Sequence, residues 1–537
     1  MKKAQIIISL VTLLCTLLTF VSCGSAKENM GDAFDGINGV LDGNGAAGGP
    51  DDYLGQIAIP NYGEVPEQFE EFESPNGTEA ESYISENPFV STELESISTL
   101  SADVDTASYT LLRKLINSGY SLSELQNLAK SWIIRTEEMV NYFTYNYADA
   151  PEGEMFGTRA TISKTPWNEE TYLLTLGIKA KEIETSSPNN LVFLIDVSGS
   201  MSSEDKLPLL QTAFSYLVSQ LNENDTVSIV TYAGDERVVL DGCAGNKKET
   251  ILDAINHLTS GGSTNGEAGI RRAYEIAEAH FKPNGNNRII LASDGDLNVG
   301  ISSPEELERL VSSKKDSGIF LSVLGFGSGN FRDANMSAIA QNGNGVYHYI
   351  DCAKEAERIF ATSLLSTIYT VAKDAKFQLT FDPDYVSEYR LIGYENRLLA
   401  QEDFEDDTKD AGDVGSGHTL TVCYELKLTE NAISGGTGDQ DTALENWIKL
   451  AMRYKEPDEA VSRESELMIG EAELADAPDS EIRFIAAIIE TCMLIRNSQY
   501  GNKATTLNSI ISTLESLELT AEQEELCQLL KALSSEK

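Results

Sequence analysis

The chain contains few of the residue types from which common active sites are built. Its 537 residues include only 4 histidines, 7 cysteines and 3 tryptophans. No histidine lies next to a serine or cysteine in a recognisable nucleophile motif, and G-x-S-x-G is absent from the D-V-S-G-S-M segment. No two cysteines have a C-x-x-C spacing, so a zinc site is not indicated either. We therefore expect a protein that is not an enzyme.

Basic residues are also scarce relative to acidic ones. There are 40 Lys and Arg residues against 85 Asp and Glu residues, which gives a formal net charge of −45. A surface this acidic repels nucleic acid and anionic lipid headgroups. We expect no nucleic-acid partner, a solvated acidic exterior and loose attraction of divalent cations.

The apolar stretch at the N-terminus, Ile6 to Val21, is too short for a comfortable membrane span. Two lysines precede it and small residues follow it around Cys23, which is typical of an export signal over residues 1–23. The run F-V-S-C-G resembles the bacterial lipobox, although Phe20 replaces the usual leucine. That resemblance implies a lipid on Cys23 and attachment to a membrane of the bacterial cell envelope, on the extracytoplasmic face. An ordinary cleaved signal or an uncleaved anchor remains the alternative.

Five cysteines remain once the signal and Cys23 are set aside. Their number is odd, so buried, unpaired thiols are the expectation for them. One disulfide is compatible with an exported protein, but the sequence does not choose its pair among Cys243, Cys352, Cys423, Cys492 and Cys527.

Residues 24–90 show little hydrophobic periodicity. The first part is rich in Gly, Asp and Asn, and the second part is acidic. Such a segment cannot bury enough apolar surface to offset the entropy of ordering it. It predicts a flexible tether that holds the folded part away from the membrane.

The middle of the chain alternates between apolar runs and amphipathic helical patterns. Continuous apolar runs are typical of parallel strands that are covered on both faces. The strand candidates are Leu191–Val197, Val227–Tyr232, Arg288–Ala292, Phe320–Gly325 and Gly345–Ile350. Helical faces fall between them, one on Leu207, Leu210, Phe214, Leu217 and Leu221, another on Ile270, Ala273, Tyr274, Ala277 and Phe281. The pattern predicts an α/β domain with a doubly wound, mostly parallel sheet over residues 186–373.

Three further regions flank this domain. Residues 91–185 predict an extension that begins with a short strand and a helix, continues with a helix ending near Tyr147, and closes with strands between 155 and 182. Residues 374–476 predict a β-rich region around an acidic, glycine-rich loop, completed by the strands before Asn190. Residues 477–537 predict C-terminal helices.

Small oxygen-bearing side chains follow two of the apolar strands. Asp196, Ser198 and Ser200 stand at alternate positions after the first strand, Thr264 lies in a G-G-S-T-N loop, and Asp294 follows another strand. Carboxylates and hydroxyls suit a hard divalent cation that keeps part of its water shell, such as Mg²⁺, Ca²⁺ or Mn²⁺. Because ligand sites of such sheets lie at the carboxyl ends of the strands, these side chains should meet there.

This set resembles the metal-ion-dependent adhesion site (MIDAS) of von Willebrand factor type A (VWA) domains. Segments such as S-T-L-S-A-D-V-D-T-A-S-Y, N-L-V-F-L-I-D-V-S-G-S-M, V-L-G-F-G-S-G-N and Y-R-L-I-G-Y-E-N-R resemble, in this order, a family of bacterial VWA lipoproteins. The likeness covers roughly residues 90–500 and implies the same fold, with an N-terminal extension and an extra C-terminal region. It also implies a protein partner whose carboxylate completes the shell of the metal ion. Ser293 stands where the family often has threonine.

Some other motifs compete for the same residues. Asp294, Asp296, Asn298 and Glu305 match four positions of a calcium-binding loop, but Val299 stands where that loop needs glycine. We interpret the segment as a polar loop, in which Asp296 and Asn298 support the metal site from a second layer.

The segment before the first helix carries two more carboxylates. Asp103 and Asp105 are either ligands or, with Thr106, caps of the following helix, and capping is the favoured interpretation. His348 lies in an apolar strand, where packing is the expectation.

We expect a lipid-anchored envelope protein that binds a protein partner through a divalent ion. The alternative is an assembly or regulatory subunit whose C-terminal helices form the main interface. A hydrolase with a metal-activated water is the third hypothesis, and Asp296 is its only candidate base.

Overall fold

The computed structural model describes residues 85–537, apart from residues 104, 129–133, 184–186, 263–265, 296–308, 312–313, 315–316, 328–332, 363–368, 410, 435–445, 458, 460 and 536–537. The predicted signal, Cys23 and nearly all of the tether lie outside this part of the chain. The described residues belong to one unit, Ser74–Lys537. Within them no helix is both long and apolar enough to cross a membrane.

A central six-stranded sheet has the order β10-β9-β8-β5-β6-β7. Its strands are β5 (Asn189–Asp196), β6 (Thr226–Tyr232), β7 (Glu236–Ala244), β8 (Asn286–Ser293), β9 (Phe320–Phe326) and β10 (Tyr347–Ile350). All neighbours are parallel except β7, which runs antiparallel to β6. The prediction of an α/β, mostly parallel sheet is confirmed, but β7 was not predicted. As an edge strand in which no residue is fully buried, β7 lacks the continuous apolar run of the others.

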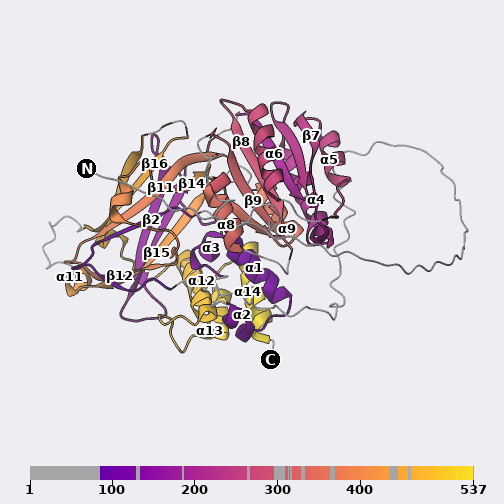
Figure 1. Cartoon of the computed structure of the whole chain (residues 1–537). Coiled ribbons are helices and arrows are strands. Elements are labelled where there is room, and N and C mark those ends of the chain that lie inside the picture. The colour runs from indigo at the N-terminus through magenta and orange to yellow at the C-terminus, as the bar shows by residue number, and fades with distance from the viewer. Residues whose placement is uncertain are drawn as a thin grey trace, which may run out of the picture. The chain divides into compact units, whose positions relative to one another are not determined.

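Helices cover both faces of this sheet (Figure 1). Side chains of β5 alternate between two cores: Phe193 packs with α4 (Leu207–Gln220), while Leu194 packs with α6 (Gly266–Ala279). The remaining helices here are α5 (Lys248–Asn256), α8 (Asp333–Asn342) and α9 (Ala353–Glu357). The predicted faces of α4 and α6 are buried except for Phe281, which lies beyond the end of α6 and is 39% exposed.

Segments from both sides of the central sheet build two further sheets. One has the order β1-β12-β15-β4-β3, and the other has the order β13-β2-β11-β16-β17 with β14 added to β11. The strands before the central sheet are β1 (Val90–Ser91), β2 (Ile97–Ser101), β3 (Phe156–Lys164) and β4 (Tyr172–Ala180). Those after it are β11 (Thr370–Phe381), β12 (Val386–Ile392), β13 (Leu398–Leu399), β14 (Gly412–Gly415), β15 (Thr419–Leu428), β16 (Asn446–Lys455) and β17 (Arg463–Gly470), with the short α11 (Glu430–Ser434) after β15.

The inner faces of these two sheets share one apolar core, with Leu176, Phe377 and Tyr424 among its members. The prediction that the strands before Asn190 complete the β-rich region is therefore confirmed. The prediction that the acidic segment is a loop is wrong in part, because this segment contains β14, which pairs with β11.

Helices from the two ends of the described chain share another core. They are α1 (Ala107–Asn117), α2 (Leu122–Leu128), α3 (Thr136–Asn141), α12 (Ser480–Arg496), α13 (Leu507–Glu515) and α14 (Ala521–Ser535). The predicted C-terminal helices are confirmed. The helix predicted to end near Tyr147 ends at Asn141, and the aromatic residues that follow pack into this core instead.

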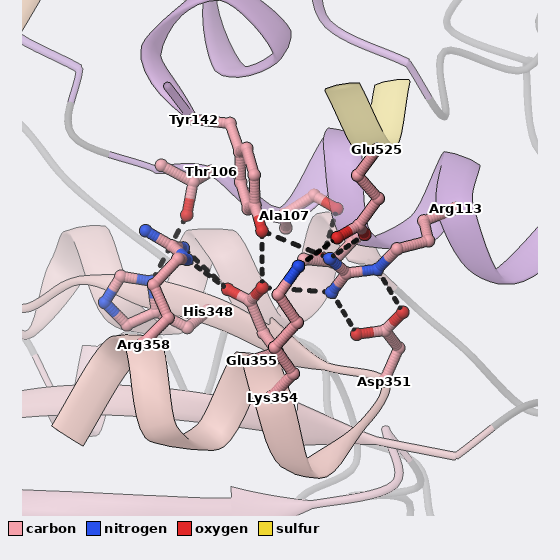
Figure 2. Close-up of polar contacts among 11 residues, drawn as sticks. Thr106, Ala107, Arg113, Tyr142, His348, Asp351, Lys354, Glu355, Arg358 and Glu525 are labelled. Atoms are coloured by element: carbon pink, nitrogen blue, oxygen red, sulfur yellow. Dashed lines mark hydrogen bonds and ion pairs between the residues drawn. The ribbon is translucent and has the colours of Figure 1, made fainter. Parts of the chain in front are cut away.

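Arg113 of α1 joins three parts of the chain (Figure 2). Its guanidinium donates to Asp351 Oδ2 at 2.8 Å, to Glu355 Oε2 at 3.0 Å and to Glu525 Oε1 at 2.8 Å. Asp351 follows β10, Glu355 lies in α9 and Glu525 lies in α14. The Tyr142 hydroxyl also donates to Glu355, at 2.8 Å. One buried cation therefore ties the end of the central α/β part to both terminal helical segments.

Candidate metal centre

Two aspartates lie at the same edge of the central sheet, where their strands end. β5 ends at Asp196, and β8 ends one residue before Asp294. The two strands are parallel neighbours with Ile195 opposite Ala292, so their carboxyl ends coincide. Both aspartates are buried, with exposures of 0% and 3%.

The turn after β5 is organised around Asp196. The Ser198 N–H donates to Asp196 Oδ1 at 2.8 Å, and the Ser293 hydroxyl donates to Asp196 Oδ2 at 3.1 Å. The hydroxyls of Ser198 and Ser200 lie 2.9 Å apart. The end of β5 and the turn Gly199–Ser202 that follows thus place one carboxylate and two hydroxyls together.

A cation of the chain itself lies in this site. Lys206 Nζ donates to Asp294 Oδ2 at 2.9 Å and to the main-chain oxygen of Ser200 at 2.9 Å. This contact was not predicted, because a lysine directly before an amphipathic helix is usually a surface residue. The lysine links the aspartate after β8 with the serine turn after β5.

The loop that carries Thr264 starts beside the same turn. Gly199 N–H donates to Gly262 O at 3.1 Å, and Gly261 N–H donates to Val197 O at 2.8 Å. Gly262 has φ +86°, a conformation that favours glycine. Thr264, Asp296 and Asn298 themselves lie outside the described residues.

The electrostatics of the site favour a bound cation. Burial, with a smaller contribution from the nearby Asp294, raises the pKa of Asp196 to about 6, although the hydrogen bonds from Ser198 and Ser293 oppose this shift. Two buried carboxylates close to one another repel unless positive charge lies between them. The donors are all carboxylate or hydroxyl oxygens, which fit Mg²⁺, Ca²⁺ or Mn²⁺ rather than a soft metal.

A second acidic cluster lies elsewhere, and it corrects the capping prediction. Thr106 is the N-cap residue of α1, but its side chain makes no capping hydrogen bond, and the Ser108 N–H of the first turn donates to Glu138 Oε2 at 2.9 Å instead. Asp103 and Asp105 instead pair with Arg397, at 2.9 Å and 3.3 Å. Together with Glu138, which pairs with Arg135, they form a buried acidic group. These carboxylates anchor the N-terminal extension to the central sheet: the Tyr347 N–H of β10, for example, donates to Asp105 Oδ1 at 3.0 Å.

The histidine prediction agrees with the structure, and the cysteine prediction agrees with it in part. His348 is buried in β10. The five predicted unpaired cysteines are free, but only Cys423, Cys492 and Cys527 are buried, whereas Cys243 and Cys352 are partly exposed.

This sheet, with D-x-S-x-S after its central strand and an aspartate after the neighbouring one, defines a VWA domain. The sequence comparisons agree: residues 190–362 match the family described as "von Willebrand factor type A domain". Residues 75–175 match one described as "von Willebrand factor", and residues 366–535 match "Uncharacterized protein YfbK, C-terminal". VWA domains are a general protein-interaction module and commonly bind a divalent metal at the adhesion site.

The chain belongs to the family of the "Uncharacterized protein YfbK" of Escherichia coli K12. The two are 38% identical over 448 residues, which cover 79% of this chain and 76% of the relative. The human inter-alpha-trypsin inhibitor heavy chain H3 is 29% identical over 149 residues, 26% of this chain and 17% of that protein. Among solved structures, a von Willebrand factor type A protein from Catenulispora acidiphila matches with 15% identity and a TM-score of 0.41, covering 72% of this chain and 91% of that one.

Proposed function

We propose that this protein binds a protein partner through a divalent metal ion at the carboxyl edge of the central sheet, without enzymatic activity. One observation carries the proposal. Asp294, distant in sequence from Asp196, Ser198 and Ser200, lies at the same edge of the sheet, where the Lys206 ammonium contacts both the Asp294 carboxylate and the main-chain oxygen of Ser200.

The residues that would hold the ion are Asp196, Ser198, Ser200 and Asp294, with Thr264 from the adjoining loop. Two carboxylates balance the charge of a divalent ion, while neutral hydroxyls leave it electrophilic. When bound, the ion supplies an open position for a carboxylate oxygen of the partner. This chemistry allows an acidic partner to bind a chain whose formal net charge is −45. Asp296 and Asn298 are proposed to support the site by hydrogen bonds.

The lipid anchor is part of the proposal. Cys23 would carry the lipid and residues 24–90 would hold the VWA domain away from the membrane of the bacterial envelope. Mass spectrometry of the mature N-terminus tests this, together with fractionation of Cys23→Ser. A variant that fractionates with the membrane as the wild type does would contradict the anchor.

The alternative role of the C-terminal helices as the main interface has less support. Most of α12 is buried in the core that it shares with α1 and α3, so this helix serves the interior of the chain. Truncation at residue 480 would remove that core, and only the outer surfaces of α13 and α14 remain available to a partner.

Thermal unfolding in chelator and in excess Mg²⁺ tests the metal site. A ligand that binds only the folded state stabilises it by RT ln(1 + [L]/Kd), about 2.7 kcal/mol at a hundredfold excess over Kd. We expect Mg²⁺ to raise the midpoint of the wild type and to leave Asp196→Asn unchanged. Equal rises in both proteins would mean that the acidic surface, not the site, binds the ion.

A further inference from the structure

The Lys206 side chain packs into a space that a glycine leaves open. The stem runs over Gly327 after β9, where an added Cβ would overlap the Cγ, Cδ and Cε atoms of the lysine. Gly327 has φ +80°, and its main-chain oxygen accepts a hydrogen bond from the buried hydroxyl of Tyr349. The lysine side chain is 12% exposed and that of Asp294 is 1% exposed. This side chain is therefore largely buried, unlike the lysines of exposed surface ion pairs.

The residue before Lys206 is tied to the N-terminal extension. Lys114 Nζ of α1 donates to Asp205 Oδ2 at 2.7 Å, and the Ser203 hydroxyl donates to Asp205 Oδ1 at 2.6 Å. Helix α1 thus holds the segment from which Lys206 reaches into the metal centre. Arg113, one residue earlier on α1, contacts α9 and α14.

An ammonium and a divalent ion cannot both stay on the Asp294 carboxylate at low cost. Each stabilises the buried carboxylates, but the two cations repel one another in a site of low dielectric. A divalent ion alone makes the pair of aspartates neutral, whereas an ion added to the lysine leaves an enclosed positive charge.

We propose that Lys206 is an internal competitor of the metal: its ammonium must leave Asp294 before a divalent ion binds, and the Lys114–Asp205 pair holds it in place. This inference rests on the proposed metal site and adds a regulatory residue to it. Lys206 lowers the apparent metal affinity and stabilises the site when no ion is bound. Movement of α1 shifts the balance between the two cations.

The test is a Mn²⁺ titration of the full chain, with free Mn²⁺ followed by electron paramagnetic resonance. Lys206→Met removes the competing charge, and Lys206→Gln is a second variant that retains a donor for the Ser200 carbonyl. Lys449→Met is the matched control, because it removes one positive charge from an exposed pair with Glu466 on β16 and β17. Lys114→Met tests the support from α1. Thermal midpoints in chelator are measured for every variant.

We expect Lys206→Met and Lys206→Gln to bind Mn²⁺ at least tenfold more tightly than the wild type. The affinity of Lys114→Met should lie between that of the wild type and that of the two Lys206 variants. Lys449→Met should have the affinity of the wild type. In chelator the two Lys206 variants should unfold at lower temperature, and Mn²⁺ should restore them. Equal affinity in the wild type and both Lys206 variants would overturn the competitor role and leave the metal site intact. Specific binding in none of the proteins would instead overturn the proposed metal site.

Discussion

At the scale of single residues, the site depends on how buried oxygens are oriented. Asp196 accepts one hydrogen bond from the turn after β5 and one from Ser293 at the end of β8. These bonds fix the direction of the carboxylate before any ion arrives. Such supporting contacts affect metal affinity even though they never touch the ion.

Ser293→Ala removes one of these donors without changing the ligands. We expect metal affinity to fall about 10- to 100-fold, because the Asp196 carboxylate is no longer held in one orientation. Ser293→Thr retains the hydroxyl and should keep the affinity of the wild type. Calorimetric titration of the three proteins decides, and an alanine variant that binds as tightly as the threonine variant would exclude the orienting role.

The charged residues whose roles could not be predicted are those whose ion-pair partners lie far away along the sequence. Lys206 and Asp294 are 88 positions apart, and Arg397 and Asp103 are 294 positions apart. Nothing local marks a lysine or arginine as the counter-ion of a buried carboxylate. The aspartates and serines of the metal centre were predictable, because they follow apolar strands at a fixed spacing.

At the scale of elements, buried strands were predictable and marginal elements were not. β5, β6, β8 and β9 are continuous apolar runs, so their positions followed directly from the sequence. β7 and β14 became strands only because a neighbouring strand offers hydrogen bonds. α3 ended early because the aromatic residues after it are buried by α12 and its neighbours, a tertiary effect.

Helix α1 depends on Arg113 for its attachment to α9 and α14 (Figure 2). Arg113→Met leaves the buried carboxylates of Asp351 and Glu355 without this cation, and we expect a loss of about 3–5 kcal/mol in the free energy of unfolding. Arg113→Lys should recover only part of it, because lysine cannot donate a fork of bonds to Asp351.

The control for that prediction is Arg272→Met, which breaks an exposed pair with Glu275 and should cost less than about 1 kcal/mol. Urea denaturation of the three variants and the wild type gives the comparison. Similar losses for Arg113→Met and Arg272→Met would show that the buried cluster does not hold α1.

At the scale of the whole molecule, distant parts of the sequence share their cores. Strands on both sides of the VWA domain build the two additional sheets, and helices from the two ends pack together. The boundaries predicted for separate regions at 185, 373 and 476 therefore mark changes of pattern in the sequence. The side chains within each core come from segments far apart along the chain.

Global stability should depend on pH through His348, a buried residue of β10 whose Nδ1 lies 3.4 Å from the Thr106 hydroxyl next to α1. Burial, together with the nearby positive charge of Arg358, lowers the pKa of His348 to about 3. Between that value and the usual pKa near 6.5, the unfolded chain binds a proton that the native chain does not, so acidification favours unfolding. This histidine contributes a loss approaching about 1.4 kcal/mol per pH unit below pH 6.

Denaturation midpoints from pH 7 to pH 5 measure this effect in the wild type, in His348→Gln and in His257→Gln. His257 is exposed and serves as the control. His348→Gln should show a shallower loss of stability on acidification, and His257→Gln should follow the wild type. Parallel curves for all three would rule out this source of acid sensitivity.

The central claim is that Asp196, Ser198, Ser200 and Asp294 form one divalent metal site. The most direct test is calorimetric titration of the full chain with Mg²⁺, Mn²⁺ and Ca²⁺ beside Asp196→Ala. The variant is essential because a chain of net charge −45 binds cations nonspecifically. The account predicts a one-site isotherm for the wild type that Asp196→Ala loses. Identical, weak, multi-site curves for both proteins would contradict it.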